Sequence, residues 1–114
     1  VSPGQTVAVV GLGGVGLSSV MGAAAAGAVR VVAVDLNPEK LAMARGFGAT
    51  DTVNAGDADA VQQVRDLTGG GVDHAFEMVG SAKALEMAYR ITRRGGQTVT
   101  AGPNHQPARV ASGG

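Results

Sequence analysis

Residues 6–16 read Thr6-Val7-Ala8-Val9-Val10-Gly11-Leu12-Gly13-Gly14-Val15-Gly16, an apolar run followed by a glycine-rich turn. A continuous apolar run predicts a central parallel strand that is covered on both faces. The turn has the spacing G-x-G-x-x-G, which is weak evidence alone because the chain contains 19 glycines. Its context strengthens it, because the Ala-, Leu- and Met-rich stretch that follows predicts a helix from Val15 to about Ala28.

Each glycine of the motif has its own expected role. Gly11 permits the tight turn out of the strand, Gly13 lets a pyrophosphate approach the backbone, and Gly16 lets the helix lie close to the strand. The helix N-terminus then offers free N–H groups and a partial positive charge to the phosphates. The competing interpretation is a glycine turn with a structural role only.

A second buried run, Val31–Val34, ends at Asp35. An acid about twenty residues after the glycine turn is the third element that the motif requires. The Asp35 carboxylate can accept hydrogen bonds from both hydroxyls of an adenosine ribose. A 2′-phosphate in the same place would meet a like charge, at a cost on the order of 4 kcal/mol. The sequence therefore predicts NAD rather than NADP, with a solvated acid or a helix cap as the alternative.

Short β-branched runs alternate with helical patterns along the rest of the chain. Further strands are predicted at Asp51–Val53, Val72–Phe76 and Gln97–Ala101. Further helices are predicted from Pro38 to about Phe47, over Val61–Leu67, and through Leu85, Ala88 and Ile91 to Gly95-Gly96. This alternation predicts an α/β fold with a doubly wound parallel sheet of strand order 3-2-1-4-5. The ligand is expected at the switch point between the first and fourth strands.

Residues 1–103 are predicted to form one domain, and residues 104–114 a loop or disordered tail. A complete fold of this type has six strands, so the sixth strand is predicted to be missing and the fifth to form an open edge. The first helix has almost no polar face. It is either buried on all sides, or its small side chains are tolerated in water.

Composition excludes several functions. The net charge is zero, which argues against a nucleic-acid or anionic-membrane binder. There is no cysteine, which excludes disulfides and thiolate metal sites. No second ligand accompanies His74 or His105, so no metal site is predicted. No apolar run could span a bilayer and no secretory signal precedes the first strand, so a cytoplasmic location is expected.

Six stretches in order resemble the cofactor domain of zinc-type medium-chain alcohol dehydrogenases. They are Gly11–Ser18, Val34–Lys40, Phe47–Asp51, Gly70–Asp73, Phe76–Gly80 and Gly95–Gly96. The likeness covers nearly all of residues 4–103, whereas the tail from Asn104 resembles nothing identifiable. The resemblance therefore implies the NAD-binding Rossmann domain of such an enzyme.

The resemblance also implies roles for individual residues. Leu12, Gly13, Gly14 and Val15 would line the pyrophosphate and the nicotinamide ribose, and Asp35 and Lys40 would bind the adenosine ribose. The residues expected near the nicotinamide are Val79, Gly80, Ala101 and Gly102. Glu77, an acid inside a predicted strand, is either functional or a satisfied structural carboxylate.

In this family, hydride passes between NAD and a primary or secondary alcohol, or the aldehyde or ketone, while zinc polarises the oxygen. The family's zinc ligands are Cys and His residues that precede the glycine motif, and none of them is present here. The resemblance implies that the parent is a homodimeric or homotetrameric enzyme. No catalytic residue can be named in this chain, which is predicted to be inactive alone.

Three alternatives stay open. A zinc-free quinone reductase is the nearest, but such enzymes generally prefer NADPH and lack an acid in the place of Asp35. A methyltransferase that uses S-adenosylmethionine also combines a glycine turn with an acid after the second strand. A regulatory nucleotide-sensing module would share the fold and have no catalytic residues.

Overall fold

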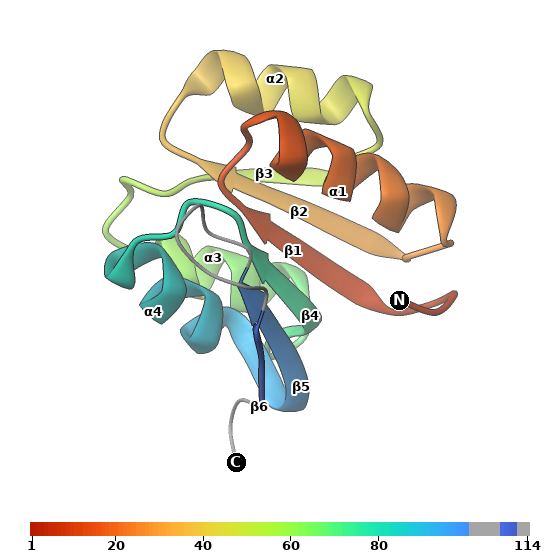
Figure 1. Ribbon diagram of the computed structural model, residues 1–114, viewed down its shortest axis with the longest axis vertical. Coiled ribbons are helices and arrows are strands. Elements are labelled where there is room, and N and C mark those ends of the chain that lie inside the picture. The colour runs from red at the N-terminus through yellow and green to blue at the C-terminus, as the bar shows by residue number, and fades with distance from the viewer. Residues whose placement is uncertain (101–107, 112–114) are drawn as a thin grey trace.

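The computed structural model describes residues 1–100 and the backbone of residues 108–111. Within these residues, the strands form one sheet of order β3-β2-β1-β4-β5-β6, with helices on both faces (Figure 1). The strands are β1 (Thr6–Val10), β2 (Arg30–Asp35), β3 (Asp51–Asn54), β4 (Val72–Glu77), β5 (Thr92–Thr100) and β6 (Ala108–Ala111). The helices are α1 (Gly14–Ala25), α2 (Pro38–Gly46), α3 (Ala60–Leu67) and α4 (Ala82–Ile91).

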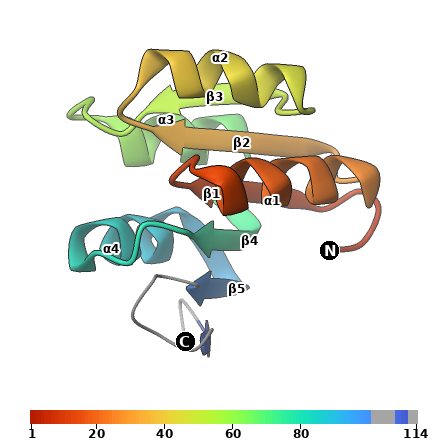
Figure 2. The same ribbon diagram turned by 45° about the horizontal axis from the view of Figure 1, so that its top comes forward.

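Strands β1 to β5 are parallel and confirm the predicted order 3-2-1-4-5. Strand β1 lies between β2 and β4, with Val9 opposite Ala33 on one side and Phe76 on the other. Figure 2 shows this order of strands from β3 at the top to β5 below. Because the strands are parallel, the turns after β1, β2 and β4 lie at one edge of the sheet, where a ligand is expected.

Successive residues of β1 divide the core into two layers. Val7 and Val9 pack against α1 and α2, in a cluster that contains Leu17, Val20 and Ala44. Ala8 and Val10 face the other side, in the cluster that holds the buried residues of α3 and α4, namely Ala60, Val64, Ala88 and Ile91. A buried valine contributes about 1.5–3 kcal/mol. Burial on both faces explains why this strand has no polar alternation.

Helix α1 is not buried on all sides. Leu17 and Val20 pack toward the sheet, whereas Val15 is 65% exposed and Met21 is 50% exposed. Part of the apolar surface of α1 is therefore exposed in this chain. None of the helices among the described residues is both long and apolar enough to cross a membrane.

The start of α2 is capped by the residue before it. The Asn37 side chain accepts a hydrogen bond of 2.9 Å from the Glu39 backbone N–H, and Pro38 occupies the first helical position. Proline is suited to this position because its fixed φ is helical and its missing N–H would have no partner there. Asp35, the last residue of β2, lies three residues before the first residue of this helix.

The prediction that the last helix continues to Gly95-Gly96 is wrong. Helix α4 ends at Ile91, and Thr92 already pairs with Val72 in the sheet. The register between β4 and β5 then shifts, and Gly95, with φ +80°, lies in this irregular stretch. The Thr92 hydroxyl bonds the Ala88 carbonyl at 2.7 Å and so closes the helix. A contact with distant Val72, rather than a local glycine signal, sets this boundary.

The prediction of a loop or disordered tail over 104–114 is wrong for residues 108–111. They form β6, which pairs antiparallel with β5, Thr98 lying opposite Val110. The edge of β5 is therefore covered by a strand, although not by another parallel strand. A strand in this position needs no helical crossover before it, because its pairing with β5 is antiparallel.

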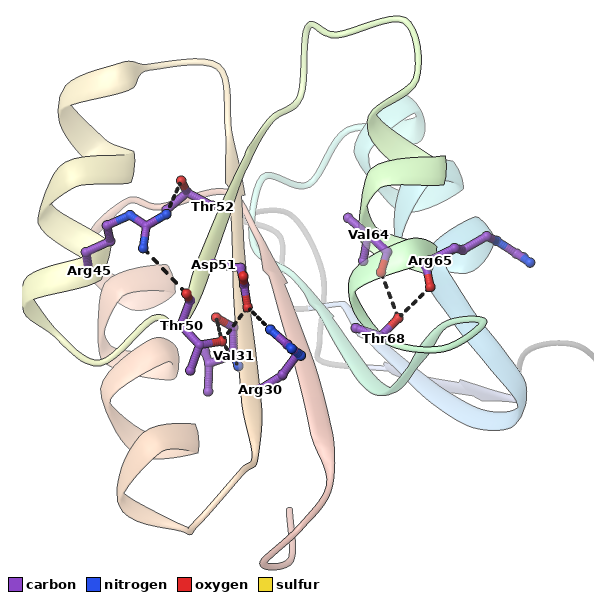
Figure 3. Close-up of polar contacts among 9 residues, drawn as sticks. All are labelled: Arg30, Val31, Arg45, Thr50, Asp51, Thr52, Val64, Arg65 and Thr68. Atoms are coloured by element: carbon purple, nitrogen blue, oxygen red, sulfur yellow. Dashed lines mark hydrogen bonds and ion pairs between the residues drawn. The ribbon is translucent and has the colours of Figure 1, made fainter.

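The end of the sheet opposite the ligand edge carries a charged network (Figure 3). Arg30 forms an ion pair with Asp51, Nη1 to Oδ2 2.9 Å, and the Thr50 hydroxyl lies 2.8 Å from the same carboxylate. Arg45 donates to the Thr50 carbonyl and the Thr52 hydroxyl, both at 3.4 Å. Burial raises the pKa of Asp51, but Thr50 and Arg30 outweigh it and hold that pKa below its usual value.

Figure 3 also shows how α3 ends. The Thr68 hydroxyl donates to the Val64 carbonyl at 2.7 Å, and the Gly71 backbone N–H donates to the same hydroxyl at 3.1 Å. Gly69, Gly70 and Gly71 all have positive φ, as expected for a glycine run that stops a helix. Thr68 thereby fixes the approach to β4.

A second carboxylate at this end, Asp73, is expected to contribute to the loss of stability at acid pH. Burial raises its pKa, but the Thr6 backbone N–H and the Arg93 guanidinium outweigh burial and lower that pKa below the usual 3.8. A carboxylate whose pKa is lower in the folded than in the unfolded state stabilises the fold at pH values above the unfolded-state pKa. This stabilisation is lost as the pH falls through the folded-state pKa. We expect Asp73→Asn to lose about 2 kcal/mol at pH 7 and to flatten the decline below about pH 4.

Urea unfolding between pH 7 and pH 2 measures both effects. The control is Asp66→Asn, which removes an exposed carboxylate of α3 that bonds only Gln62 among the described contacts. An Asp73→Asn acid limb as steep as that of the wild type would contradict the role given to Asp73.

Candidate functional site

The glycine turn leaves β1 through Gly11. Its backbone N–H donates to the Val34 carbonyl at 2.9 Å, and its φ is +96°, which non-glycine residues rarely adopt. A Cβ at this position would also lie 2.5 Å from Val79 Cγ2. Gly11 is therefore required by the protein itself, both for the turn and for contact with the turn after β4.

Gly16 is required for a different reason. A Cβ there would lie 1.9 Å from the Gly11 carbonyl oxygen and 2.9 Å from its carbon, which are both backbone atoms. The first turn of α1 thus rests directly on the glycine turn. This confirms the close approach that the motif predicts for its last glycine.

Gly13 and Gly14 have no comparable explanation within the chain. A Cβ at either position would meet no atom within 4 Å, and both residues are exposed. Gly13 has φ −67° and ψ −172°, which any residue can adopt. Neither packing nor backbone conformation requires glycine at these two positions, so the backbone here is open to a ligand.

The N-terminus of α1 begins at this open backbone. The N-cap is Gly13, no side chain caps the helix, and its first turn contains no acidic residue. A helix of 12 residues has a positive end equivalent to about half an elementary charge. The open glycines and the uncapped helix end together form a suitable seat for a pyrophosphate.

Asp35 joins the glycine turn to the end of β2. Its Oδ2 accepts a hydrogen bond of 2.7 Å from the Leu12 N–H, and its Oδ1 accepts one of 2.9 Å from the Asn37 N–H. The carboxylate is only partly buried, so its free lone pairs can still accept hydrogen bonds from a ligand. Asp35 is therefore both a support of the turn and an acceptor facing the site.

A cavity of about 610 Å³ opens beside Asp35, between the loop after β3 and helix α4. This volume lies within the usual range for small-molecule and cofactor sites. Leu36, Val79 and Met87 contribute apolar walls, while Asp35 and Lys83 contribute charge. The cavity thus combines apolar walls with a few polar groups, as a nucleobase and its ribose require.

The predicted site residues do not all lie together. Gly11, Asp35 and Val79 line the cavity, whereas Lys40 is half-buried on α2 and is not among the lining residues. Leu12 is buried beneath the turn, and Val15 is exposed on the first turn of α1. Gly80 directly follows Val79. Ala101, Gly102 and His105 lie outside the described residues.

Several residues that line the cavity were not predicted from the sequence. Leu36 could have been found, because it directly follows Asp35 at the end of a strand. Asp57 and Lys83 come from the β3–α3 loop and from α4, and no local pattern distinguishes them from solvated charges. Only the fold brings these segments to the same cavity.

Glu77 proves to be a fully satisfied buried carboxylate. It is 1% exposed, and its Oε2 accepts hydrogen bonds of 2.5 Å from the N–H groups of both Val79 and Gly80. Its Oε1 accepts a hydrogen bond of 2.6 Å from the Thr100 hydroxyl. The carboxylate therefore holds the turn that follows β4.

A family model described as zinc-binding dehydrogenase matches residues 14–112. The chain belongs to this family. Within it, an S-(hydroxymethyl)glutathione dehydrogenase from Synechocystis sp. is 48% identical over 105 residues, covering 90% of this chain and 28% of that relative.

Solved structures of the same family superpose closely on this chain. An alcohol dehydrogenase zinc-binding domain protein from Burkholderia ambifaria has a TM-score of 0.87 at 37% identity, covering 93% of this chain and 30% of that one. An alcohol dehydrogenase from Thermus sp. has a TM-score of 0.86 at 37% identity, covering 95% of this chain and 32% of that one. This zinc-binding dehydrogenase chain thus spans 28–32% of the length of these three relatives.

Zinc itself does not fit the described residues. No three His, Cys, Asp or Glu side chains in this part of the zinc-binding dehydrogenase chain are grouped so that they could hold a metal ion. The Nε2 of His74 lies 2.9 Å from Oε1 of Gln5. Because a zinc site needs three or four protein ligands, we assign no chemical step in this chain to zinc.

Proposed function

We propose that this chain is the NAD-binding domain of an NAD-dependent, zinc-type alcohol dehydrogenase. The observation that carries the proposal is the position of Asp35, whose carboxylate holds the glycine turn and lines the cavity beside it. Membership of the zinc-binding dehydrogenase family and the names of the relatives support the same function.

The arrangement suggests how NAD would be held. The adenine would enter the cavity between Leu36 and Val79, and Asp35 would accept hydrogen bonds from the adenosine ribose. Lys40 would approach that ribose from α2. The pyrophosphate would lie over Gly13 and Gly14 at the N-terminus of α1.

The other assigned positions follow from the same pose. Leu12 and Val15 would border the pyrophosphate and the second ribose. The position of Val79 in the same cavity as Asp35 favours contact with the adenine rather than with the nicotinamide. Gly80, Ala101 and Gly102 stay predicted for the nicotinamide side.

When bound, NAD supplies the nicotinamide carbon that accepts or donates hydride. The residues of this chain bind and orient the dinucleotide, and none of them is assigned a proton or a bond to a substrate. We propose that the whole protein oxidises a primary or secondary alcohol, or reduces the aldehyde or ketone, in the cytoplasm as a homodimer or homotetramer. The chain by itself is expected to bind NAD without turning over alcohol.

Calorimetric titration of the purified chain with NADH, NADPH and S-adenosylmethionine tests this proposal. We expect binding of NADH in preference to the other two ligands. Gly13→Ala should weaken NADH binding at least tenfold, because the new methyl group occupies the space that the pyrophosphate needs. It should lower the free energy of unfolding by only about 1 kcal/mol or less, since no protein atom is displaced and only the N-cap preference changes.

The result that supports the proposal is therefore a stable Gly13→Ala chain with weak NADH binding. Unchanged NADH binding by that variant would mean that the open backbone is not the pyrophosphate seat. Preferential binding of S-adenosylmethionine by the wild type would replace the proposed cofactor with that of a methyltransferase.

A further inference from the structure

The carboxylate of Glu77 is buried and has no oppositely charged partner among the described residues. It lies at the end of β4, is 1% exposed, and is satisfied by two backbone N–H groups and one hydroxyl. All three donors are neutral. Hydrogen bonds to a charged acceptor contribute about 1.5–3 kcal/mol, and a buried group that loses its partner costs about as much. The hydrogen bonds of the Glu77 carboxylate therefore strongly constrain the backbone that follows β4.

That constraint acts on Val79 and Gly80. Val79 is 49% exposed, so burial of its side chain contributes little to holding the turn in place. Gly80 has φ +86°, in the left-handed region, so the chain continues neither as a strand nor directly as a helix at this residue. Both N–H groups converge on one oxygen of Glu77 at 2.5 Å. The carboxylate thus determines where this turn lies.

The turn after β4 also forms one wall of the cavity. Val79 lines the cavity, and its Cγ2 packs so closely over Gly11 that a Cβ there would lie 2.5 Å away. Asp35 holds the opposite side by accepting the Leu12 N–H at 2.7 Å. Two carboxylates from different strands therefore fix two turns that contact each other across the same site.

We propose that Glu77 is a positioning residue for the nucleotide: it holds Val79 at the distance from Asp35 that admits an adenosine group. It acts through Val79 and does not itself touch the ligand. This inference rests on the proposed function, because it concerns the same cavity. Thr100, which bonds the second oxygen of Glu77, is the outer member of this support.

Three variants separate this role from plain stability. Glu77→Met keeps an unbranched side chain of similar length but leaves both N–H groups without their acceptor, whereas Glu77→Gln retains one oxygen that can accept both. Thr100→Val removes only the outer hydroxyl. The matched control is Thr98→Val, another buried threonine of β5, whose hydroxyl lies 2.9 Å from that of Thr92, away from the cavity.

The readouts are calorimetric affinities for NADH and for AMP, unfolding in urea, and amide hydrogen exchange at Val79 and Gly80. We expect Glu77→Met to weaken both ligands about tenfold or more, Thr100→Val about threefold, and Glu77→Gln less than threefold. Amide exchange at the two turn positions should accelerate in Glu77→Met and Thr100→Val. Thr98→Val should lose as much stability as Thr100→Val but keep wild-type affinities and wild-type exchange at the turn.

Each outcome decides something. If Glu77→Met does not fold, the comparison of Thr100→Val with Thr98→Val still carries the test. Equal NADH and AMP affinities in these two threonine variants, with equal exchange at Val79 and Gly80, would overturn the positioning role and leave NAD binding intact. A folded wild-type chain that binds neither NADH nor AMP would overturn the proposed function, and the role of Glu77 with it.

Discussion

Replacing Gly16 with alanine is expected to destabilise the fold by about 3 kcal/mol or more. The added Cβ would lie 1.9 Å from the carbonyl oxygen of Gly11, a backbone atom that cannot rotate away. Helix α1 would have to move off the sheet, and burial of Leu17 and Val20 would be reduced. Urea unfolding monitored by far-UV circular dichroism measures the loss.

The same helix contains its own control. Gly22 lies in the middle of α1, and a Cβ there would meet nothing within 4 Å. Gly22→Ala should therefore gain roughly 0.5–1 kcal/mol, because alanine has the higher helix propensity. If Gly16→Ala proved as stable as Gly22→Ala, the close approach of α1 to the glycine turn would be wrong.

Replacing Asp35 with alanine is expected to abolish the preference for NADH over NADPH. Loss of hydrogen bonds between a charged acceptor and the ribose hydroxyls should weaken NADH on the order of 100-fold. NADPH binding should be kept or strengthened, because the variant removes a like charge that costs about 4 kcal/mol beside a 2′-phosphate. Parallel calorimetric titrations with the two cofactors give the ratio directly.

Asp35→Ala also removes a support of the fold, since the Leu12 and Asn37 N–H groups lose their acceptor. Asn37→Ala controls for this loss, because it removes the cap of α2 next to the site, at about 1 kcal/mol, without removing the carboxylate. We expect Asn37→Ala to bind NADH within a few-fold of the wild type. An Asp35→Ala chain that still prefers NADH would mean that another group reads the ribose.

The central part of the fold could be predicted because its signals are local. The valine side chains of β1 and β2 are removed from water only if both faces of the sheet are covered. The spacing of Gly11, Gly16 and Asp35 specifies a strand, a turn, a helix and a second strand in that order. The strand order then followed from right-handed crossovers.

The parts that were not predicted depend on distant contacts. Helix α4 ends where Thr92 meets Val72, and nothing near residue 92 announces that pairing. Strand β6 is only four residues long, and pairing with its partner β5 supplies the reason for its conformation. The cavity was likewise invisible, because Lys83 and Asp57 approach Asp35 only after the sheet has formed.

Glu77 shows the same limit within the site. The sequence indicates an acid in a buried strand but cannot choose between a structural and a functional role. The choice depends on the donors that surround it, and one of them, Thr100, is 23 residues away. Chemistry that is assembled from separate segments needs the fold before it can be interpreted.

The central position of β1 has a consequence for the order in which the chain folds. β1 pairs with β2 through a single helical connection, but its other neighbour is β4, whose residues begin at Val72. While the chain is being synthesised, β1, β2 and β3 can associate before β4 exists. During that interval, the strand that becomes the centre of the sheet is a free edge, with unpaired backbone groups and exposed valines. Formation of the complete sheet must wait for this long-range pairing, which slows folding and leaves the early half of the molecule open to aggregation.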